Sequence, residues 1–429
     1  MANNKDNTNT PESKDTQNES MNAEPRCVIC GRPKSKVPFM YRSDHKSGGC
    51  VCSDCIETAH QFTVAHMADI GGKLKASEEE DCKVDFNPTI PTPHEIKEYL
   101  DQYVIGQDDA KITLSVAVYN HYKRITQKKS DNDDDNVEID KSNILLCGQT
   151  GSGKTLLART IAKLLDVPFA IADATVFTEA GYVGEDVESM LTRLLQACDY
   201  DVKKAEMGIV LLDEADKLGR KSDNPSITRD VNGEGVQQAL LKMLEGTDVL
   251  VPQQGGRKHP DAKMISVNTK NILFICSGAF VGIEDVIGQR LNTRSIGFDT
   301  TPQDESSKID KENLIRYIEP VDLKRFGFIP EIIGRLPVIT YVEKLDKTAL
   351  KRILVEPKNA IIKQYKKLFE MDNVKLTFTD NAYDSIVQEA ISTNTGARGL
   401  KNIVERILKQ HMYDIPTEHP QEVVIDKIA

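Results

Sequence analysis

The sequence predicts an α/β protein whose parallel sheet and flanking helices are followed by a small helical domain and preceded by a small zinc-binding domain. Three observations lead to this prediction. Between residues 93 and 342, short apolar runs alternate with helix-like stretches, as in a parallel sheet with helical crossovers. From residue 343 to 429 the pattern is mostly helical, apart from the strand-like VKLTFT. Two cysteine pairs near the N-terminus have the spacing of zinc ligands.

Composition restricts the class of protein. The chain has 429 residues, of which 39% are hydrophobic and 28% charged, and its net charge is -11. No apolar run reaches the ~18 residues of a membrane span, and no apolar signal core marks the N-terminus. The negative charge argues against a nucleic-acid backbone as the main ligand. We therefore expect a cytoplasmic protein with reduced thiols and with neither a membrane nor a nucleic-acid partner.

The first part of the chain consists of a tail, a cysteine cluster and a linker. Residues 1–24 contain almost no apolar side chain, so we expect a disordered tail. Residues 25–68 hold the cysteine cluster. Residues 69–92 contain glycines, an acidic run and prolines, which is typical of a flexible linker. Further along, residues 128–141 are a polar insert that we expect to form a surface loop.

The cysteine cluster predicts one structural zinc site. Cys27 and Cys30 form one knuckle, and Cys52 and Cys55 form the other. Residues 31–51 separate the knuckles, slightly more than the ~15–20 residues usual for this pattern. Cys50 is a further thiol that could compete with Cys52, although its spacing to Cys55 is poorer for a knuckle. A redox-active pair is the alternative, but it would need only one of the two pairs.

A glycine-rich stretch predicts a phosphate site. GQTGSGKT, residues 148–155, fits G-x-x-x-x-G-K-[ST] and lies between an apolar strand and a stretch with helical spacing. Its backbone N–H groups and the helix N-terminus would face phosphate oxygens. Lys154 is expected to reach the β- and γ-phosphates of ATP, and Thr155 to hold Mg²⁺. The residues predicted to contact the nucleotide here are Gln149, Thr150, Gly151, Ser152, Gly153, Lys154, Thr155 and Leu156.

The run IVLLDEAD, residues 209–216, is the expected companion of this loop. Four apolar residues predict a buried strand with acidic residues at its C-terminal end. Asp213 could coordinate Mg²⁺, and Glu214 could polarise the attacking water, which would make the site hydrolytic. A solvent-exposed strand end is the alternative, and the phosphate loop decides against it.

The phosphate loop, LLDEAD and the sequence between them resemble the AAA+ ATPases. More narrowly, the chain resembles the ring-forming protein unfoldases of this family, which deliver polypeptide to a separate peptidase. The resemblance extends over roughly residues 25 to 425. It rests on these features in this order: the cysteine cluster, YVIGQ, GQTGSGKT, GYVGED, LLDEADK, GGRKHP, IGF, IPEIIGRLPV and TGARGL. It implies ATP hydrolysis by a homohexamer, protein substrates, adaptors and a peptidase partner, with a zinc module that dimerises and recruits substrates.

The resemblance also implies roles for individual residues around the nucleotide. Arg335 in IIGRLPV matches the arginine finger that acts on the neighbouring subunit's nucleotide. Arg398 in NTGARGL matches the sensor-2 arginine, which reads the nucleotide of its own subunit and couples hydrolysis to domain rotation. Val104 and Ile105 in YVIGQ match the segment that contacts adenine, and Ser277 is assigned to sensor 1. Without the resemblance, an arginine would more often be a surface residue.

Three loops of the resembling unfoldases contact polypeptide or the peptidase. Tyr182 and Val183 lie between glycines in GYVG and match the channel loop that grips substrate, where an aromatic ring can contact almost any side chain. A ring folded onto the protein's own surface is the alternative. The matching residues of the other two loops are Arg257, Lys258 and His259 at the channel mouth, and Ile296, Gly297 and Phe298 for docking on the peptidase. A solvated charge run and a loop anchor are the respective alternatives.

Two other functions are conceivable for such a chain. A DNA-directed AAA+ machine, such as a helicase or clamp loader, would read nucleic acid with the zinc module, but the sequence lacks a basic stripe. A scaffold that binds ATP only as a structural ligand would need neither Glu214 nor Arg335. No G-x-S-x-G or H-E-x-x-H protease signature occurs in the chain.

Overall fold

The computed structural model describes residues 24–42, 49–59, 90–127, 137, 139–178, 184–219, 233–252, 264–294, 310, 313–393, 395–418 and 420–426. The chain divides into two compact units, Met1–Phe86 and Asn87–Ala429. Most of the predicted tail, linker and polar insert lies outside the described residues. None of the described helices is long and apolar enough to cross a membrane.

The first unit is a small hairpin with few apolar side chains to bury. A short 3-10 turn, η1 (Lys34–Lys36), precedes β1 (Met40–Arg42), which pairs antiparallel with β2 (Cys50–Cys52). A helix over residues 53–59 follows directly. Cys27 and Cys52 are its buried hydrophobic residues among those described, with 2% and 0% exposure. A unit this small is held by cross-links or metal rather than by a core.

The second unit contains the predicted parallel sheet. Within the described residues it has five strands in the order β4-β5-β8-β3-β9, and every neighbouring pair is parallel. The central strands β3, β5 and β8 are almost continuously buried, as expected where both faces of a parallel sheet are covered, whereas the outer strands β4 and β9 are only partly buried. Their bounds are β3 (Ile144–Cys147), β4 (Phe169–Asp173), β5 (Ile209–Asp213), β8 (Leu273–Gly278) and β9 (Val338–Tyr341).

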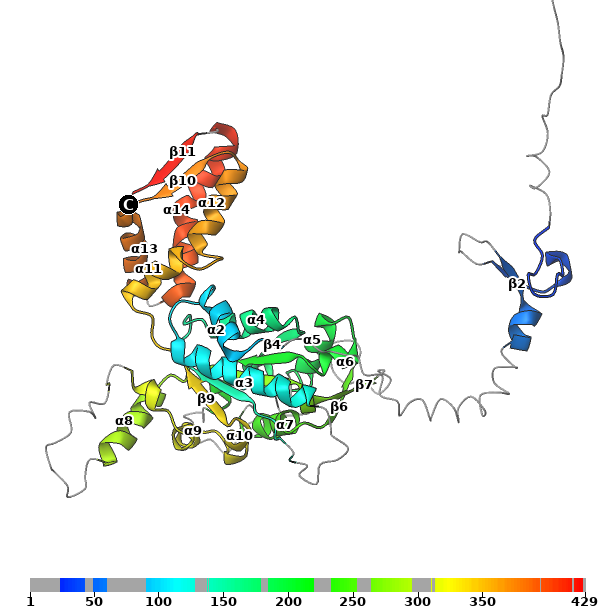
Figure 1. Cartoon of the computed structure of the whole chain (residues 1–429), viewed down its shortest axis with the longest axis horizontal. Coiled ribbons are helices and arrows are strands. Elements are labelled where there is room, and N and C mark those ends of the chain that lie inside the picture. The colour runs from blue at the N-terminus through cyan, green and yellow to red at the C-terminus, as the bar shows by residue number, and fades with distance from the viewer. Residues whose placement is uncertain are drawn as a thin grey trace, which may run out of the picture. The chain divides into compact units, whose positions relative to one another are not determined.

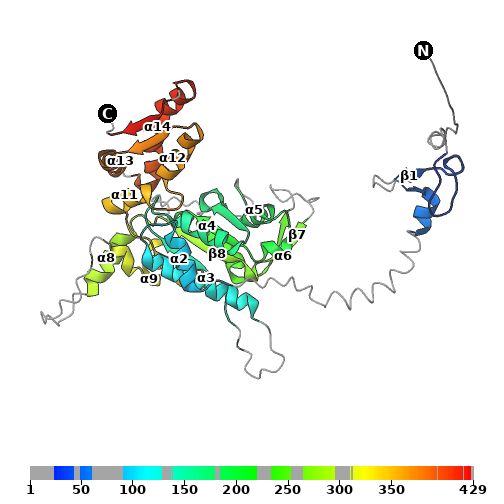
Figure 2. The same ribbon diagram turned by 45° about the horizontal axis from the view of Figure 1, so that its top comes forward.

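Helices cover this sheet. Helices α2, α3 and α4 lie beside one another in both views (Figure 1, Figure 2), and α4 contacts β5 and β8. The helices are α2 (Pro93–Asp101), α3 (Asp108–Thr126), α4 (Lys154–Leu165), α5 (Ser189–Ala197), α6 (Val202–Ala205), α7 (Glu234–Glu245), α8 (Ile283–Arg294), α9 (Pro320–Phe326) and α10 (Pro330–Arg335). Short 3-10 turns are η2 (Ala174–Val176), η3 (Ala215–Leu218), η4 (Thr269–Asn271) and η6 (Leu314–Tyr317), and β6 (Asp248–Pro252) forms an antiparallel pair with β7 (Met264–Asn268).

The remaining elements, yellow-orange to red in Figure 1, have their own hydrophobic cluster. They are α11 (Lys347–Val355), α12 (Ile361–Met371), β10 (Lys375–Phe378), α13 (Asp380–Ser392), α14 (Gly396–Glu418) and β11 (Glu422–Ile425). The strand-like VKLTFT forms β10, as predicted. It pairs in parallel with β11, a second strand that the sequence analysis did not identify. The boundary between residues 342 and 343 stays a prediction.

The sheet topology determines where a site can form. Strands β3 and β5 both neighbour β8, and Cys147 at the end of β3 lies opposite Gly278 at the end of β8. The carboxyl ends of these strands therefore meet at one edge of the sheet, where ligands bind in open α/β folds. The loop after Cys147 and the acidic residues Asp213 and Glu214 both begin at this edge.

Candidate nucleotide and metal sites

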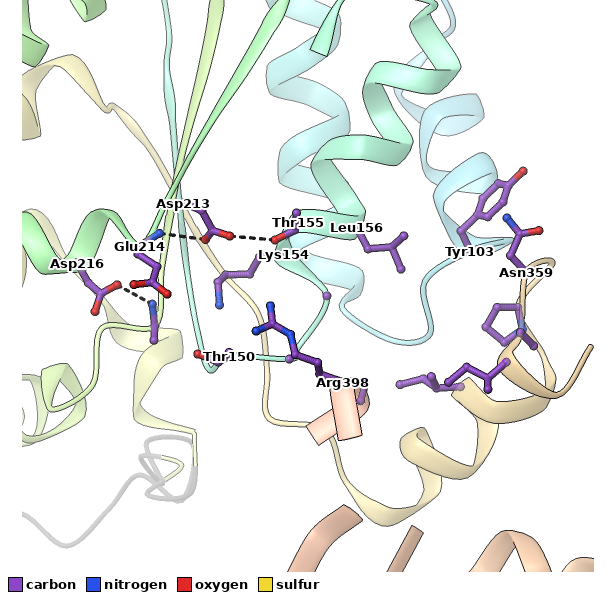
Figure 3. Close-up of a pocket in the computed structure, with 18 of the residues that line it drawn as sticks. Tyr103, Thr150, Lys154, Thr155, Leu156, Asp213, Glu214, Asp216, Asn359 and Arg398 are labelled. Carbon is purple, nitrogen blue, oxygen red and sulfur yellow. Dashed lines mark hydrogen bonds between the residues drawn. The ribbon is translucent and has the colours of Figure 1, made fainter. Parts of the chain in front are cut away.

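A cavity of about 400 Å³ opens at this edge (Figure 3). The large sheet-bearing part contributes one side of it, and the α11, α12 and α14 region contributes the other. The cavity is lined by Tyr103, Thr150, Gly151, Gly153, Lys154, Thr155, Leu156, Asp213, Glu214, Asp216, Lys217, Ala279, Ile353, Pro357, Asn359, Ala360, Ile361, Ala397 and Arg398. The structure therefore brings the predicted phosphate loop, acidic pair and Arg398 together.

The phosphate loop needs glycine at two points. Gly153 is the N-cap of α4 with φ 102°, a conformation that side chains strongly disfavour. A Cβ atom on Gly148, whose φ is 141°, would approach the Val342 side chain to 2.4 Å. The loop can therefore turn tightly from β3 into α4 and present backbone N–H groups to an anion.

Lys154 is the first residue of α4, and its side chain is largely buried with 8% exposure. Its ammonium group donates to the carbonyl oxygens of Gly148 at 2.5 Å and Gln149 at 2.9 Å. Burial lowers the pKa of Lys154, while the nearby carboxylates of Asp213 and Asp216 act in the opposite direction. The side chain thus holds a cation over the loop, where phosphate oxygens would bind.

Asp213 lies at the end of β5. Several hydrogen-bond donors orient its carboxylate. Ser277 donates from its hydroxyl to Oδ1 at 2.7 Å, and the backbone N–H of Glu214 donates to the same oxygen at 3.0 Å. The Thr155 hydroxyl donates to Oδ2 at 3.3 Å (Figure 3). Neighbouring oxygen ligands of an octahedral Mg²⁺ lie about 3 Å apart. The hydroxyl of Thr155 and the carboxylate of Asp213 therefore fit a Mg²⁺ site.

Glu214 has an unusual backbone for a residue with a side chain. Its φ of 55° and ψ of 29° lie in the left-handed region. Strained conformations of this kind concentrate at functional sites. The turn directs the Glu214 side chain into the cavity beside Asp213 (Figure 3). A carboxylate at this position can accept a proton from a water next to the phosphates.

Asp216, which the sequence analysis did not select, also lines the cavity. It is 1% exposed, accepts a hydrogen bond from the backbone N–H of Ala279 at 3.1 Å and lies 3.5 Å from the ammonium of Lys217. It ties the turn after β5 to the end of β8. Its acidic side chain in LLDEAD was a signal that could have identified it.

The predicted adenine contacts Val104 and Ile105 stay predictions. Val104 and Ile105 are buried, with 5% and 7% exposure, and neither is among the residues that line the cavity. The neighbouring Tyr103 lines it, at the opposite end from Asp213 and Glu214 (Figure 3). Tyr103 and the lining segment from Ile353 to Ile361 were not predicted from the sequence, because that segment carries no recognisable phosphate or metal motif.

Arg398 and Arg335 have different surroundings. Arg398 lies in the first turn of α14, which approaches the phosphate loop so closely that a Cβ on Gly151 would meet the backbone oxygen of Thr395 at 3.1 Å. Arg335 ends α10 and, although described, does not line the cavity of its own chain. Its guanidinium donates to Glu245 at 2.9 Å, and the pair is largely exposed.

The backbone of Arg335 is also anchored. The side-chain amide of Asn143, the residue before β3, donates to the carbonyl oxygen of Arg335 at 2.9 Å and to that of Leu244 at 3.2 Å. Asn143 is 1% exposed. The ends of α7 and α10 are thus joined to the start of β3, which holds the backbone of Arg335 in place.

Three of the predicted loops lie outside the part of the chain that the structure describes. Residues 179–183, 253–263 and 295–309 lie outside the described residues. The predicted loop residues among them are Tyr182, Val183, Arg257, Lys258, His259, Ile296, Gly297 and Phe298. On either side of the first segment, Phe177 and Glu185 form a β-bridge, and Phe177 is 1% exposed.

The four predicted zinc ligands converge in the first unit. Among the described residues, the sulfur atoms of Cys27, Cys30, Cys52 and Cys55 all lie within 4.8 Å of one another. Those of Cys30 and Cys52 are 3.6 Å apart. A tetrahedral zinc with bonds of about 2.3 Å would separate its sulfurs by about 3.8 Å. The set therefore fits zinc, and Cys50 does not belong to it.

The surroundings of two of these sulfurs, those of Cys27 and Cys30, favour thiolates, whereas the thiols of Cys52 and Cys30 raise the pKa of Cys55 to about 12. The backbone N–H of Cys52 donates to the sulfur of Cys27 at 3.4 Å, and the guanidinium of Arg32 donates to that of Cys30 at 3.4 Å. Backbone N–H groups of Cys30 and Cys52 lower the pKa of Cys27 to about 6. Such second contacts orient thiolate ligands and stabilise their charge.

Comparison with known proteins gives a consistent result. The family model described as AAA domain (Cdc48 subfamily) matches residues 139–339, and that of the C-terminal, D2-small domain of ClpB protein matches residues 345–426. The ATP-dependent Clp protease ATP-binding subunit ClpX of Bacteroides thetaiotaomicron is 59% identical over 397 residues, 92% of each chain. Proteins of the same name from Porphyromonas gingivalis and Treponema denticola are 57% and 50% identical, over 94% of this chain and 94% and 92% of theirs.

Proposed function

Because the chain belongs to the ClpX family of ATP-binding subunits of the ATP-dependent Clp protease, we propose that it unfolds proteins as a homohexameric ring and passes them to the ClpP peptidase. ATP hydrolysis follows from membership of this AAA+ family. The observation that carries the proposal is the convergence of Lys154, Asp213, Glu214 and Arg398 on one cavity.

In the proposed site, Lys154 binds the β- and γ-phosphates, and the N–H groups of residues 149–156 bind the remaining phosphate oxygens. Thr155 and Asp213 hold Mg²⁺, which would neutralise charge on the phosphates. Glu214 removes a proton from the attacking water. Ser277, through its hydrogen bond to Asp213, keeps the carboxylate oriented in the manner of a sensor-1 residue.

Two arginines complete the proposed hydrolysis. Arg398 acts on the nucleotide of its own chain, because it lines the same cavity as Lys154. Arg335 acts on the nucleotide of the neighbouring subunit as an arginine finger. Its position outside the cavity of its own chain supports this assignment. In a ring, Arg335 would leave Glu245 when it binds a phosphate of the neighbouring subunit's nucleotide.

The parts of the chain that contact other proteins stay predictions. We propose that Tyr182 and Val183 grip polypeptide in the ring channel, and that the β-bridge between Phe177 and Glu185 supports their loop. Residues 257–259 would meet incoming substrate, and residues 296–298 would dock on ClpP. The zinc module, proposed as residues 25–68, would recruit substrates and adaptors, and the motor would consist of a large domain (93–342) and a small domain (343–429).

The test measures ATP hydrolysis with and without green fluorescent protein that carries an unstructured C-terminal peptide. We expect the tagged protein to stimulate hydrolysis and to lose fluorescence only when ATP and ClpP are both present. Untagged green fluorescent protein is the control. Stimulation by DNA in place of protein, or hydrolysis without any loss of fluorescence, would contradict the proposed function.

A further inference from the structure

Gln107 makes an unusual pair of hydrogen bonds with the chain between the two proposed domains. Its Nε2 donates to the carbonyl oxygen of Glu343 at 2.9 Å, and its Oε1 accepts from the backbone N–H of Glu343 at 2.7 Å. The side-chain amide thus takes the place that a neighbouring strand would have. Gln107 is 6% exposed, so these bonds are shielded from water and costly to lose.

The hydrogen bonds from Gln107 fix the backbone at Glu343, beyond the last residues that pair within the sheet. Strand β9 ends at Tyr341, and Val342 still donates from its N–H to the carbonyl oxygen of Cys147 at 2.8 Å. Glu343 is the next residue. Without Gln107, the backbone N–H and carbonyl groups of Glu343 would lie beyond the hydrogen-bond ladder of the sheet.

Side chains around Glu343 add to this anchorage. The carboxylate of Glu343 lies 3.1 Å from the guanidinium of Arg316, and Tyr341 donates from its hydroxyl to Asp109 at 2.6 Å. Asp109 belongs to the first turn of α3, and Gln107 is the N-cap residue directly before it. The start of α3 and the η6 region therefore hold the exit from β9 on two sides.

The next anchored point is close. Asp346 accepts from the backbone N–H of Ala349 at 2.7 Å and caps α11, the first helix after the sheet. Lys344 and Leu345 lie between this cap and Glu343. If Glu343 is held by Gln107, the backbone dihedral angles available for a rotation between the sheet and α11 are those of Lys344 and Leu345.

The same glutamine is part of the turn that reaches the nucleotide cavity. Tyr103 lines the cavity, and residues 104–106 connect it to Gln107. The ammonium of Lys111 donates to the carbonyl oxygen of Val104 at 2.7 Å and to Asp101 at 2.6 Å, which holds the turn against α2 and α3. A displacement at Tyr103 would therefore be passed along a short, held segment to Glu343.

We propose that Gln107 is a positioning residue that makes Glu343 the fixed end of the hinge, so that nucleotide-driven rotation occurs at Lys344 and Leu345 and is transmitted as force. This inference rests on the proposed unfolding function. Without the two hydrogen bonds, the hinge would gain freedom at Glu343. Part of each rotation would then be absorbed in the hinge, and ATP would be consumed without movement of substrate.

The experiment compares Gln107→Met with Gln237→Met. Methionine keeps the length of glutamine and removes both hydrogen bonds. Gln237 is a matched control: it is 2% exposed, donates to the carbonyl oxygens of Leu218 and Gly327 at 2.9 and 3.2 Å, and accepts from the N–H of Ile329 at 2.9 Å. All of its partners lie within the proposed large domain, so its loss weakens packing without touching the hinge.

Two measurements are made on the full-length chain. Hydrogen exchange reports the amide of Glu343, which should exchange about tenfold faster in Gln107→Met, the effect of losing a buried hydrogen bond. ATP consumed per tagged green fluorescent protein unfolded, measured with ClpP present so that unfolding is read as lost fluorescence, reports coupling. We expect this ratio to rise at least about threefold in Gln107→Met and to stay near the parent value in Gln237→Met.

The outcomes separate the inference from the function on which it rests. If the parent chain unfolds the tagged protein and the ratio is unchanged in Gln107→Met, or rises equally in Gln237→Met, the hinge role is wrong. Failure of the parent chain to unfold it would instead contradict the proposed function. If Gln107→Met does not fold, Gln107→Glu is compared with Gln237→Glu in the same way, since glutamate keeps the acceptor and loses the donor.

Discussion

Replacement of Ser277 by alanine tests whether the Asp213 carboxylate must be oriented for hydrolysis. Ser277 is 0% exposed, and its hydroxyl donates to Asp213 at 2.7 Å. It is not among the residues that line the nucleotide cavity. The side chain can therefore influence the nucleotide only through Asp213, and its removal should affect catalysis much more than binding.

The size of the effect follows from the hydrogen bonds of Asp213. A hydrogen bond to a charged group contributes about 1.5–3 kcal/mol, which corresponds to roughly 10- to 150-fold in a rate. Asp213 Oδ1 keeps the N–H of Glu214 as a donor at 3.0 Å, so we expect the lower end of this range. The kcat for ATP should fall about tenfold. The Kd of the nucleotide should change less than about threefold, because Lys154 and the loop N–H groups are untouched.

The assay measures steady-state ATP hydrolysis, together with nucleotide affinity by fluorescence titration. Ser115→Ala is the matched control, because Ser115 is 1% exposed in α3 and its hydroxyl has no hydrogen-bond partner among the described residues. A kcat of Ser277→Ala within twofold of the control would refute the reasoning. So would a loss of activity that weaker nucleotide binding fully explains.

Four further outcomes are expected. Glu214→Gln should bind ATP normally and hydrolyse almost none, since it loses the base but keeps the Mg²⁺ ligands; turnover near the parent rate would show the assignment to be wrong. Metal analysis should find about one zinc per chain, and Cys52→Ser should lower it; an unchanged content would contradict the four-thiolate site. Tyr182→Ala should keep ATP hydrolysis while more ATP is consumed per substrate unfolded, and an unchanged ratio would mean that the ring does not grip. Burial and the charge of Arg124 lower the pKa of His121 to about 3, so between pH 6.5 and about 3 only the unfolded chain takes up this proton. Over this window His121 should lower the free energy of unfolding by up to about 1.4 kcal/mol for each unit that the pH falls, and urea titrations should show a shallower fall in His121→Gln.

Local patterns were sufficient to predict the parts of the fold that depend on neighbours in the chain. The buried strands β3, β5 and β8 are continuous apolar runs, and the phosphate loop lies between a strand and a helix in the order that its chemistry requires. The cysteine spacing predicted the four converging sulfurs in the same way, and geometry then separated Cys50 from the set.

Features that depend on distant segments were missed. Strand β11 has only four residues, and its partner β10 lies well before it in the chain, so its short alternation of Val423 and Ile425 with exposed residues was not distinctive. The cavity wall around Pro357 and Asn359 belongs to an ordinary connection between α11 and α12. These residues become part of the site only because the chain folds back against the turn at Tyr103, and no local spacing records that contact.

The hydrogen bond between Asn143 and Arg335 has a consequence for how neighbouring active sites could communicate. Asn143 directly precedes strand β3, and the phosphate loop directly follows it. If Arg335 serves the next subunit's nucleotide, this one strand carries the anchor of a neighbour's catalytic arginine at one end and its own phosphate loop at the other. Four residues of extended chain span only about 13 Å. A shift of the phosphate loop on hydrolysis would then reach the neighbouring nucleotide site through strand β3 alone. Successive subunits of the proposed ring could therefore hydrolyse ATP in order, without a longer chain of contacts between the sites.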